Sequence, residues 1–206
     1  MSELLEIFPH NIDERKIKEI VERLRQGEII ILPTDTIYAL VGDLNHRQVL
    51  DNICKLTGIK PNKANLSILC RDLSDLSTYS RPIDNSTYKL MNRLLPGPFT
   101  FILNASAAVP KIFRRNKKTI GIRIPQHPII QKIIEELGNP LISTSIHAED
   151  EIQAYLTEPE EIYQAWNEKV ELIVDGGAGS NVGSTVIDAT ENEIYIVREG
   201  QGMELI

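Results

Sequence analysis

Aromatic residues, cysteine and histidine are all scarce in this chain of 206 residues. Phe, Trp and Tyr together make up 5% of the sequence, so the core must be built from aliphatic side chains. The 2 cysteines and 4 histidines form no CxxC, HxH or HxxxH pair. That spacing gives no sign of a disulfide framework or a zinc site. We therefore expect Cys54 and Cys70 to be reduced, buried thiols and the protein to hold no metal of its own.

Long hydrophobic runs are absent as well. The apolar stretches are far shorter than the roughly 20 residues of a transmembrane helix, and the N-terminal segment MSELLEIFPHNIDERK lacks the apolar core of a signal peptide. With 42% hydrophobic and 25% charged residues, the composition predicts a cytoplasmic protein with no membrane contact. The net charge of −7 argues against general nucleic-acid coating but leaves room for a local basic patch.

Helix and strand patterns alternate along the first two thirds of the chain, and the last third is rich in strands. Helical spacing of apolar residues predicts helices over 11–27, 47–58, 84–97, 127–138 and 158–168. Apolar runs predict strands over 28–32, 66–70, 99–103, 119–124, 140–145, 170–175, 184–189 and 193–197. We therefore expect an α/β fold in a single domain, with a sheet that is both parallel and antiparallel and is flanked by helices.

Hydroxyl and guanidinium groups stand at the ends of several predicted strands: Thr34, Ser143, Ser145, Ser184, Thr185 and Arg198. Arg123 lies within its strand, on the same face as Thr119 by alternation. An arginine there needs an anion, either a structural carboxylate or a bound ligand. The hydroxyls have a plain alternative, which is to satisfy turns, and Arg198 could pair with a protein carboxylate. Together these groups predict a cleft at the strand ends that binds a phosphate or a carboxylate.

Two further segments admit two interpretations each. The basic run 111–118 is either a solvated loop or a phosphate-binding patch, and it carries Lys111, Arg114, Arg115, Lys117 and Lys118. The glycine-rich segment 175–184 is either a flexible connection or a loop that packs against a ligand. It precedes a strand rather than a helix, which excludes a Rossmann or Walker motif. No GxSxG elbow is present, so the sequence offers no nucleophile for covalent catalysis.

Six segments in one order carry a resemblance to a known family: PTDTIYAL, LLPGPFTFIL, TIGIRIPQHPI, PLISTSI, VDGG with GSTVID, and IVREG. The chain resembles the YrdC/YciO family, the threonylcarbamoyl-AMP synthase superfamily, and is closest to the YciO branch. The resemblance covers roughly residues 10–202. It implies one YrdC-like domain over 1–206 with a YrdC/RibB-like fold, in which a twisted open sheet borders a large, positively charged cavity.

The resemblance also implies an activity. L-threonine and bicarbonate form a carbamate whose carboxylate attacks the α-phosphate of ATP, and pyrophosphate leaves. The product feeds the t6A modification of tRNA. The chemistry needs no enzyme nucleophile and no prosthetic group, and magnesium accompanies the phosphates. The alternative is a family member that binds double-stranded RNA or tRNA through the basic run and has no adenylation activity.

The family's binding residues can be carried over to matching positions. Those that hold the amino acid match Thr34 and Arg123, with Tyr38 in the same region. Positions around the nucleotide match Thr119, Ser145, Ser184 and Arg198, and Ser143 lies beside them. Lys60 stands in for the arginine of the family's Lys-x-Arg motif, with help from Lys55.

Several positions depart from the family's pattern. Thr57 occupies the place of the motif's lysine, and Asp35 replaces the glutamate of PTET. The family's Ser-Ala-Asn becomes Ser145-Ile146-His147, and the glycine after the tyrosine becomes Ala39. Because a lysine is a point charge where arginine offers a fork, these changes predict looser positioning of phosphates and a weaker synthase activity.

Overall fold

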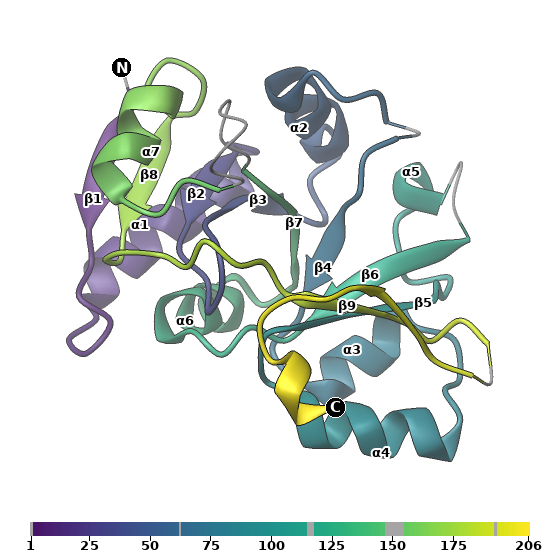
Figure 1. Cartoon of the computed structure of the whole chain (residues 1–206). Helices are drawn as coiled ribbons and strands as arrows, with labels where there is room; N and C mark the ends of the chain where they lie inside the picture. The colour runs from purple at the N-terminus through teal and green to yellow at the C-terminus, as the bar shows by residue number, and fades with distance from the viewer. Residues whose placement is uncertain (1, 62, 115–117, 147–154, 192) are drawn as a thin grey trace.

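A mixed β-sheet runs through the whole molecule. The structure is a computed structural model that describes residues 2–61, 63–114, 118–146, 155–191 and 193–206 (Figure 1). Its described strands are β1 (Glu3–Glu6), β2 (Ile30–Leu32), β3 (Ala39–Asp43), β4 (Ser67–Leu69), β5 (Phe99–Asn104), β6 (Thr119–Arg123), β7 (Leu141–Ser145), β8 (Leu172–Asp175), β9 (Thr185–Asp188) and β10 (Tyr195–Arg198). They form one sheet in the order β1-β8-β2-β3-β7-β4-β6-β5-β9-β10.

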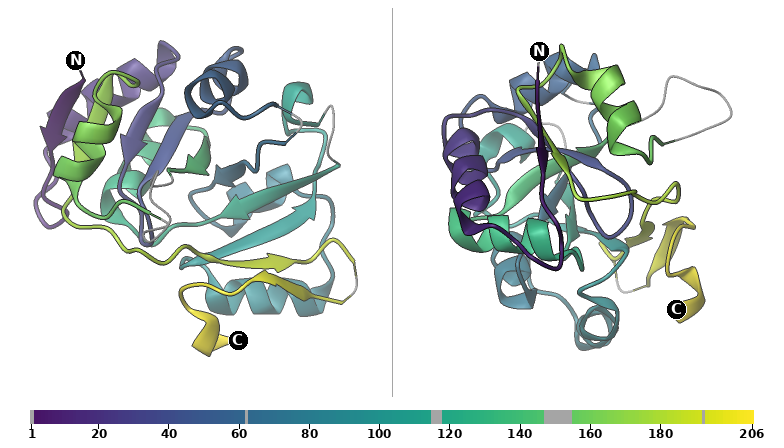
Figure 2. Two further views of the ribbon diagram at one scale, coloured as in Figure 1. Left: turned by 45° about the horizontal axis from the view of Figure 1, so that its top comes forward. Right: turned by 90° about the vertical axis from the view of Figure 1, so that its left-hand side faces the viewer.

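Both strand orientations occur in this sheet, as the sequence predicts. The pairs β1·β8, β2·β8, β4·β6 and β5·β9 are parallel, and the pairs β2·β3, β3·β7, β4·β7, β5·β6 and β9·β10 are antiparallel. Figure 2 shows that strands at the two ends of the sheet point in different directions. This strong twist opens space beside the central strands.

Helices cover the sheet. They are α1 (Glu14–Arg25), α2 (Val49–Thr57), α3 (Leu73–Tyr79), α4 (Asn85–Leu94), α5 (Lys111–Arg114), α6 (Pro128–Leu137) and α7 (Pro159–Trp166), with a short 3-10 turn, η1 (Met203–Leu205). The apolar faces of α1 and α6 form one core with β2, β3 and β8, while α3, α4 and α7 pack into a second core with β4, β5 and β6. None of the helices in the described part of the chain has the length and apolar character that a membrane span requires.

The sequence missed four short elements, namely β1, β3, α3 and α5. The failure to predict β3 matters most, because β2 and β3 form an antiparallel hairpin whose loop is residues 33–38. The polar stretch PTDT is therefore a hairpin loop between two strands rather than the end of one strand. β3 escaped notice because all five of its residues are buried, so its sequence shows no apolar and polar alternation.

Tyr38 links this hairpin to the glycine-rich segment by hydrogen bonds. Its side chain is fully buried, and its hydroxyl donates to the carbonyl of Gly177 (2.6 Å) and accepts from the amide of Gly176 (3.2 Å). Burial raises the pKa of Tyr38 to about 12, so the hydroxyl stays protonated. A Cβ on Gly179 would lie 2.9 Å from the Tyr38 ring, so only glycine fits there. The glycine-rich segment is thus packed against a tyrosine.

Replacing Tyr38 with Phe tests how much these hydrogen bonds stabilise the protein. The change leaves the ring in place and removes both hydrogen bonds, the one to the carbonyl of Gly177 and the one from the amide of Gly176. We expect the free energy of unfolding to fall by about 1–3 kcal/mol. Urea unfolding followed by circular dichroism measures the change. Tyr88→Phe is the control, because Tyr88 is 44% exposed; an equal loss in both variants would contradict the prediction.

Candidate functional site

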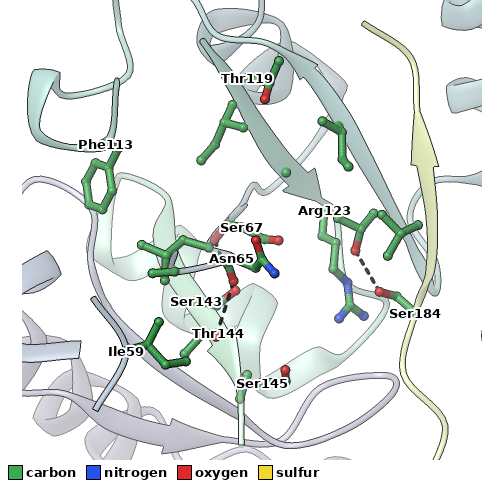
Figure 3. A pocket seen from close by; sticks show the side chains of 18 of the residues that line it. Ile59, Asn65, Ser67, Phe113, Thr119, Arg123, Ser143, Thr144, Ser145 and Ser184 are labelled. Carbon is green, nitrogen blue, oxygen red and sulfur yellow. Dashed lines mark hydrogen bonds between the residues drawn. The ribbon is translucent and has the colours of Figure 1, made fainter. Parts of the chain in front are cut away.

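A cavity of about 510 Å³ opens beside the central strands (Figure 3). Its floor and walls come from β5, β6, β7, β9 and β10, from the hairpin, and from the segment 59–67 between α2 and β4. This volume is within the usual range for small-molecule sites, roughly 300–1,000 Å³. The strand ends meet at this cavity, as the sequence predicts.

Six of the side chains that the sequence singles out line the cavity: Thr119, Arg123, Ser143, Ser145, Ser184 and Arg198. Thr119 and Arg123 both line the cavity from β6, as the alternation argument expects. The other predicted cleft residues are not among the described residues that line it: Thr34, Tyr38, Lys55, Lys60 and Thr185. Their roles in ligand binding stay predictions.

Thr34 shapes the hairpin loop. Its side chain is buried, and its hydroxyl donates to the carbonyl of Ile37 (2.7 Å) while accepting from the amide of Thr36 (3.1 Å). The Thr36 carbonyl in turn accepts from the amide of Ser180 (2.8 Å), which ties the loop to the glycine-rich segment. Because these bonds fix the loop's backbone, they also fix the direction of Asp35, which stands between the two threonines.

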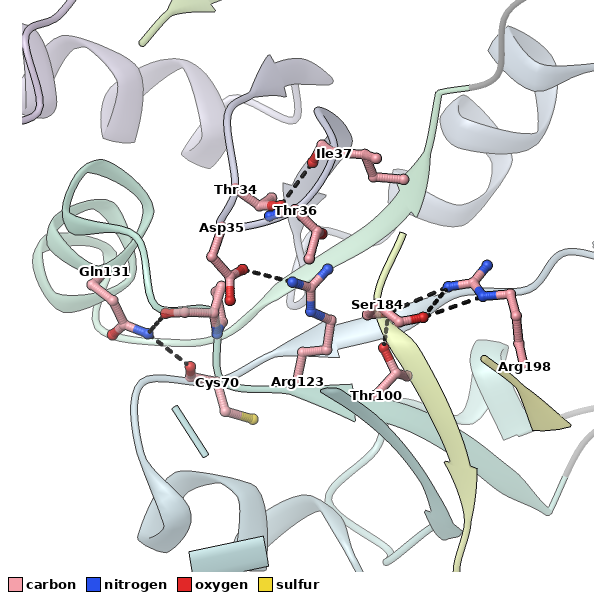
Figure 4. Close-up of polar contacts among 11 residues, drawn as sticks. Thr34, Asp35, Thr36, Ile37, Cys70, Thr100, Arg123, Gln131, Ser184 and Arg198 are labelled. Carbon is pink, nitrogen blue, oxygen red and sulfur yellow. Dashed lines mark hydrogen bonds and ion pairs between the residues drawn. The ribbon is translucent and has the colours of Figure 1, made fainter. Parts of the chain in front are cut away.

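Asp35 pairs with Arg123 inside the protein (Figure 4). The Arg123 Nη2 atom donates to Asp35 Oδ1 at 2.6 Å, and both side chains are only 9% exposed. Desolvation lowers the pKa of Arg123 and Asp35 opposes that shift, while nearby Arg198 lowers it further. The sequence left open whether Arg123 meets a structural carboxylate or a ligand. The structure supplies the carboxylate, and one face of Arg123 still borders the cavity.

Arg198 lines the cavity from edge strand β10, where it contacts Ser184. Its Nη2 and Nε atoms donate to the carbonyl of Ser184 (2.8 and 3.2 Å), and the Ser184 hydroxyl is hydrogen-bonded to that of Thr100 (2.8 Å). In the described part of the chain Arg198 forms no ion pair, so the expected carboxylate partner is replaced by a backbone carbonyl. Its positive charge therefore remains available to a ligand.

The charges around the cavity are all of one sign. Lys63, Arg123 and Arg198 line it, and no Asp or Glu does among the described residues. In a chain of net charge −7, this is a marked local excess of positive charge. Low-dielectric walls strengthen the resulting potential and favour an anionic ligand.

The sequence missed several lining residues, of which Lys63, Asn65, Ser67, Thr100 and Phe113 are the most relevant. Figure 3 shows Phe113 and Ile59 on one side of the cavity, with Arg123 and Ser184 on the other. The cavity thus has an apolar end and a polar end. The apolar positions gave no signal in the sequence, because aliphatic and aromatic residues are equally expected in a core.

The basic run only partly falls within the described residues. Lys111 and Lys118 are exposed and do not line the cavity, Arg115 and Lys117 lie outside the described residues, and nothing is described of the Arg114 side chain. The RNA-binding alternative therefore stays a prediction. His147, which replaces the family's asparagine, also lies outside the described residues.

The cysteines are as expected. Cys54 and Cys70 are buried and free, and burial raises the pKa of both thiols. Within the ranges that the structure describes, no three side chains of His, Cys, Asp or Glu come together as a metal-binding group.

Comparisons with known proteins agree with this geometry. A family model described as telomere recombination, for the Sua5, YciO and YrdC proteins, matches residues 22–200. The chain belongs to the Sua5/YciO/YrdC family. This confirms the resemblance drawn from the six sequence segments.

Two relatives illustrate the similarity of this chain to other proteins of the family. The chain is 39% identical over 203 residues to the uncharacterised protein YciO of Escherichia coli K12, covering 98% of this chain and 97% of that protein. It is 29% identical over 190 residues to the threonylcarbamoyl-AMP synthase of Pyrococcus abyssi, covering 92% of this chain and 55% of the synthase.

Solved structures confirm the fold. The crystal structure of E. coli YciO superimposes with a TM-score of 0.90 at 38% identity and covers 98% of this chain and 97% of YciO. The structure of P. abyssi Sua5 complexed with L-threonine gives a TM-score of 0.87 at 27% identity and covers 97% of this chain and 58% of Sua5.

The ion pair of Arg123 and Asp35 yields a stability prediction. Asp35→Ala leaves a buried guanidinium without its counter-charge, so we expect a loss of about 3–5 kcal/mol in the free energy of unfolding. The double variant Asp35→Ala with Arg123→Met should lose clearly less than the two single losses added together. Urea unfolding of Asp35→Ala, Arg123→Met and the double variant measures the three losses in the free energy of unfolding. Lys132→Ala, which breaks an exposed pair with Glu135, should cost less than about 1 kcal/mol; strictly additive losses would contradict coupling.

His127 yields a prediction for pH. Its Nδ1 atom is buried without a hydrogen-bond partner, and burial lowers the pKa of His127 although Asp35 opposes the shift. As pH falls below the unfolded pKa of about 6.5, the unfolded chain takes up a proton that the folded protein resists, so stability is lost. His127→Gln should therefore lose less stability between neutral and mildly acidic pH. Urea unfolding at both values measures this, with the exposed His10→Gln as control; an unchanged pH dependence would disprove it.

Proposed function

We propose that this protein catalyses a threonylcarbamoyl-AMP synthase reaction. L-threonine and bicarbonate give a carbamate and water. A carboxylate oxygen of the carbamate then attacks the α-phosphorus of ATP while the bond to pyrophosphate breaks. The observation that carries the proposal is the cavity, whose charged lining is wholly cationic among the described residues. It is supported by a backbone that matches P. abyssi Sua5 complexed with L-threonine.

The lining suits a reaction that depends on positioning rather than on a nucleophile. Hydroxyl groups from β6, from β7 and from Ser184 just before β9, together with guanidinium groups from β6 and β10, line the space. Such groups orient two reactants and stabilise charge that develops on the transferring phosphate. In this proposal Arg123 holds the amino acid, and Thr119, Ser145 and Arg198 contact the nucleotide.

The pairing of Arg123 with Asp35 supports this proposed arrangement of amino acid and nucleotide. Because Asp35 already offsets the charge of Arg123, a further polyphosphate at Arg123 would meet the repulsion of a buried carboxylate. Free L-threonine, before it forms the carbamate, is a zwitterion and meets less repulsion, since its ammonium group balances its carboxylate. The amino acid is therefore best accommodated at the Arg123 end.

The apolar end of the cavity suits the base of the nucleotide. Ile59 and Phe113 lie there, away from Arg123, and Ile112 packs with Phe113 against the same small apolar cluster. A planar base gains favourable contact with an aromatic ring and aliphatic side chains. The phosphates then extend toward the polar side chains at the centre of the cavity.

Magnesium enters this proposal with ATP. The described lining residues include no carboxylate, so they do not provide the oxygen ligands from side chains that this ion prefers. The ion is therefore best placed on the phosphates themselves, where it supplies charge neutralisation.

Exchange of labelled pyrophosphate into ATP tests the reaction. We expect exchange only when L-threonine and bicarbonate are both present, because the carbamate is the attacking group. Arg198→Met should lower the exchange at least tenfold, since it removes a charge-assisted contact of about 1.5–3 kcal/mol. β10 is held by backbone pairing with β9, so the variant should fold. Exchange that persists without threonine or bicarbonate, or none at all, would refute the proposed function.

A further inference from the structure

A tight turn after α2 decides which lysine faces the cavity. Helix α2 ends at Gly58, which adopts a left-handed backbone conformation (φ 69°). Two residues later the Lys60 carbonyl accepts hydrogen bonds from the amides of Lys63 (2.8 Å) and Ala64 (3.1 Å). Both bonds are made just before β4, and they hold the backbone of Lys63 and Ala64 close to that of Lys60.

The turn brings Lys63 to the cavity and leaves the other two lysines outside its lining. Lys63 lines the cavity, whereas Lys55 on α2 and Lys60 in the turn do not. Lys63 is also exposed and forms no ion pair within the described part of the chain, so no carboxylate there offsets its charge. It is therefore free to meet an anion.

Lys63 and Arg198 differ from Arg123 because, among the described residues, only Arg123 of the three has a carboxylate that offsets its charge. Arg123 is buried and paired with Asp35, while Arg198 is bonded to a carbonyl. Lys63 has no counter-charge among the described residues. The net positive charge of the cavity therefore comes from Lys63 and Arg198. They belong to the segment 59–67 and to β10, which form separate parts of the wall.

We propose that Lys63 is the phosphate-binding lysine of this cavity. It has the role that the family resemblance gave to Lys60 and Lys55. It contacts the leaving pyrophosphate portion of a nucleoside triphosphate. Asn65 and Ser67, which follow it along the same wall, supply neutral hydrogen-bonding groups beside it. The assignment rests on the proposed function for the identity of the ligand, because it takes the phosphates of ATP as the anion.

The test uses inorganic pyrophosphate as the probe and the full chain in isothermal titration. Lys63→Met removes the charge but keeps the length of the side chain, and we expect it to weaken pyrophosphate binding about tenfold. Lys60→Met removes the same charge three positions away and should leave affinity within about twofold. Lys63→Arg restores the charge and should recover affinity to within about threefold of the unmodified chain. Both lysines are exposed, so these changes should not disturb folding.

Each outcome decides the assignment. Equal weakening by the two methionine variants, weakening by Lys60→Met alone, failure of Lys63→Arg to restore binding, or no pyrophosphate binding by the unmodified chain would each overturn it. The probe needs neither threonine nor bicarbonate. Pyrophosphate binding that depends on Lys63, with no pyrophosphate exchange, would therefore refute the proposed function and support the lysine assignment.

Discussion

The buried pair of Arg123 and Asp35 is the constraint on which the site depends. An arginine in the interior of the sheet is costly unless an anion meets it. The anion comes from a loop, and a loop can hold it only if its backbone is fixed. The hydroxyls of Thr34 and Tyr38 fix that backbone, one within the loop and the other against the glycine-rich segment. The polar residues after β2 are thus explained by the buried charge of Arg123 on β6, which requires the carboxylate of Asp35.

Much of this arrangement is visible in the sequence. Strand alternation placed Thr119 and Arg123 on one face, and hydroxyls at the ends of predicted strands indicated where the cleft would lie. The demand of Arg123 for an anion was also clear, because that demand is local to the residue. Such inferences succeed because they need only the period of a strand and the cost of burying charge.

Other parts depend on contacts between distant segments and could not be predicted. Thr34 looked like a ligand-facing hydroxyl, but its bonds stay within a hairpin that the sequence did not reveal, since β3 is buried throughout. The choice of Lys63 over Lys60 depends on two hydrogen bonds to one carbonyl. Spacing alone favoured Lys60, because the family's basic motif was aligned without knowledge of that turn.

The same pairing gives the cavity two kinds of positive charge, and this division has chemical consequences. A cation with a fixed counter-ion binds a ligand through directional hydrogen bonds and adds little net attraction, which suits a zwitterion. A cation without one attracts through its net charge, which suits a polyphosphate. The proposed adenylation of a carbamate needs both kinds of recognition close together, since it starts from a small amino acid and from ATP, which carries several negative charges. Asp35 therefore serves the site by leaving Lys63 and Arg198 as the only unneutralised cations among the described lining residues.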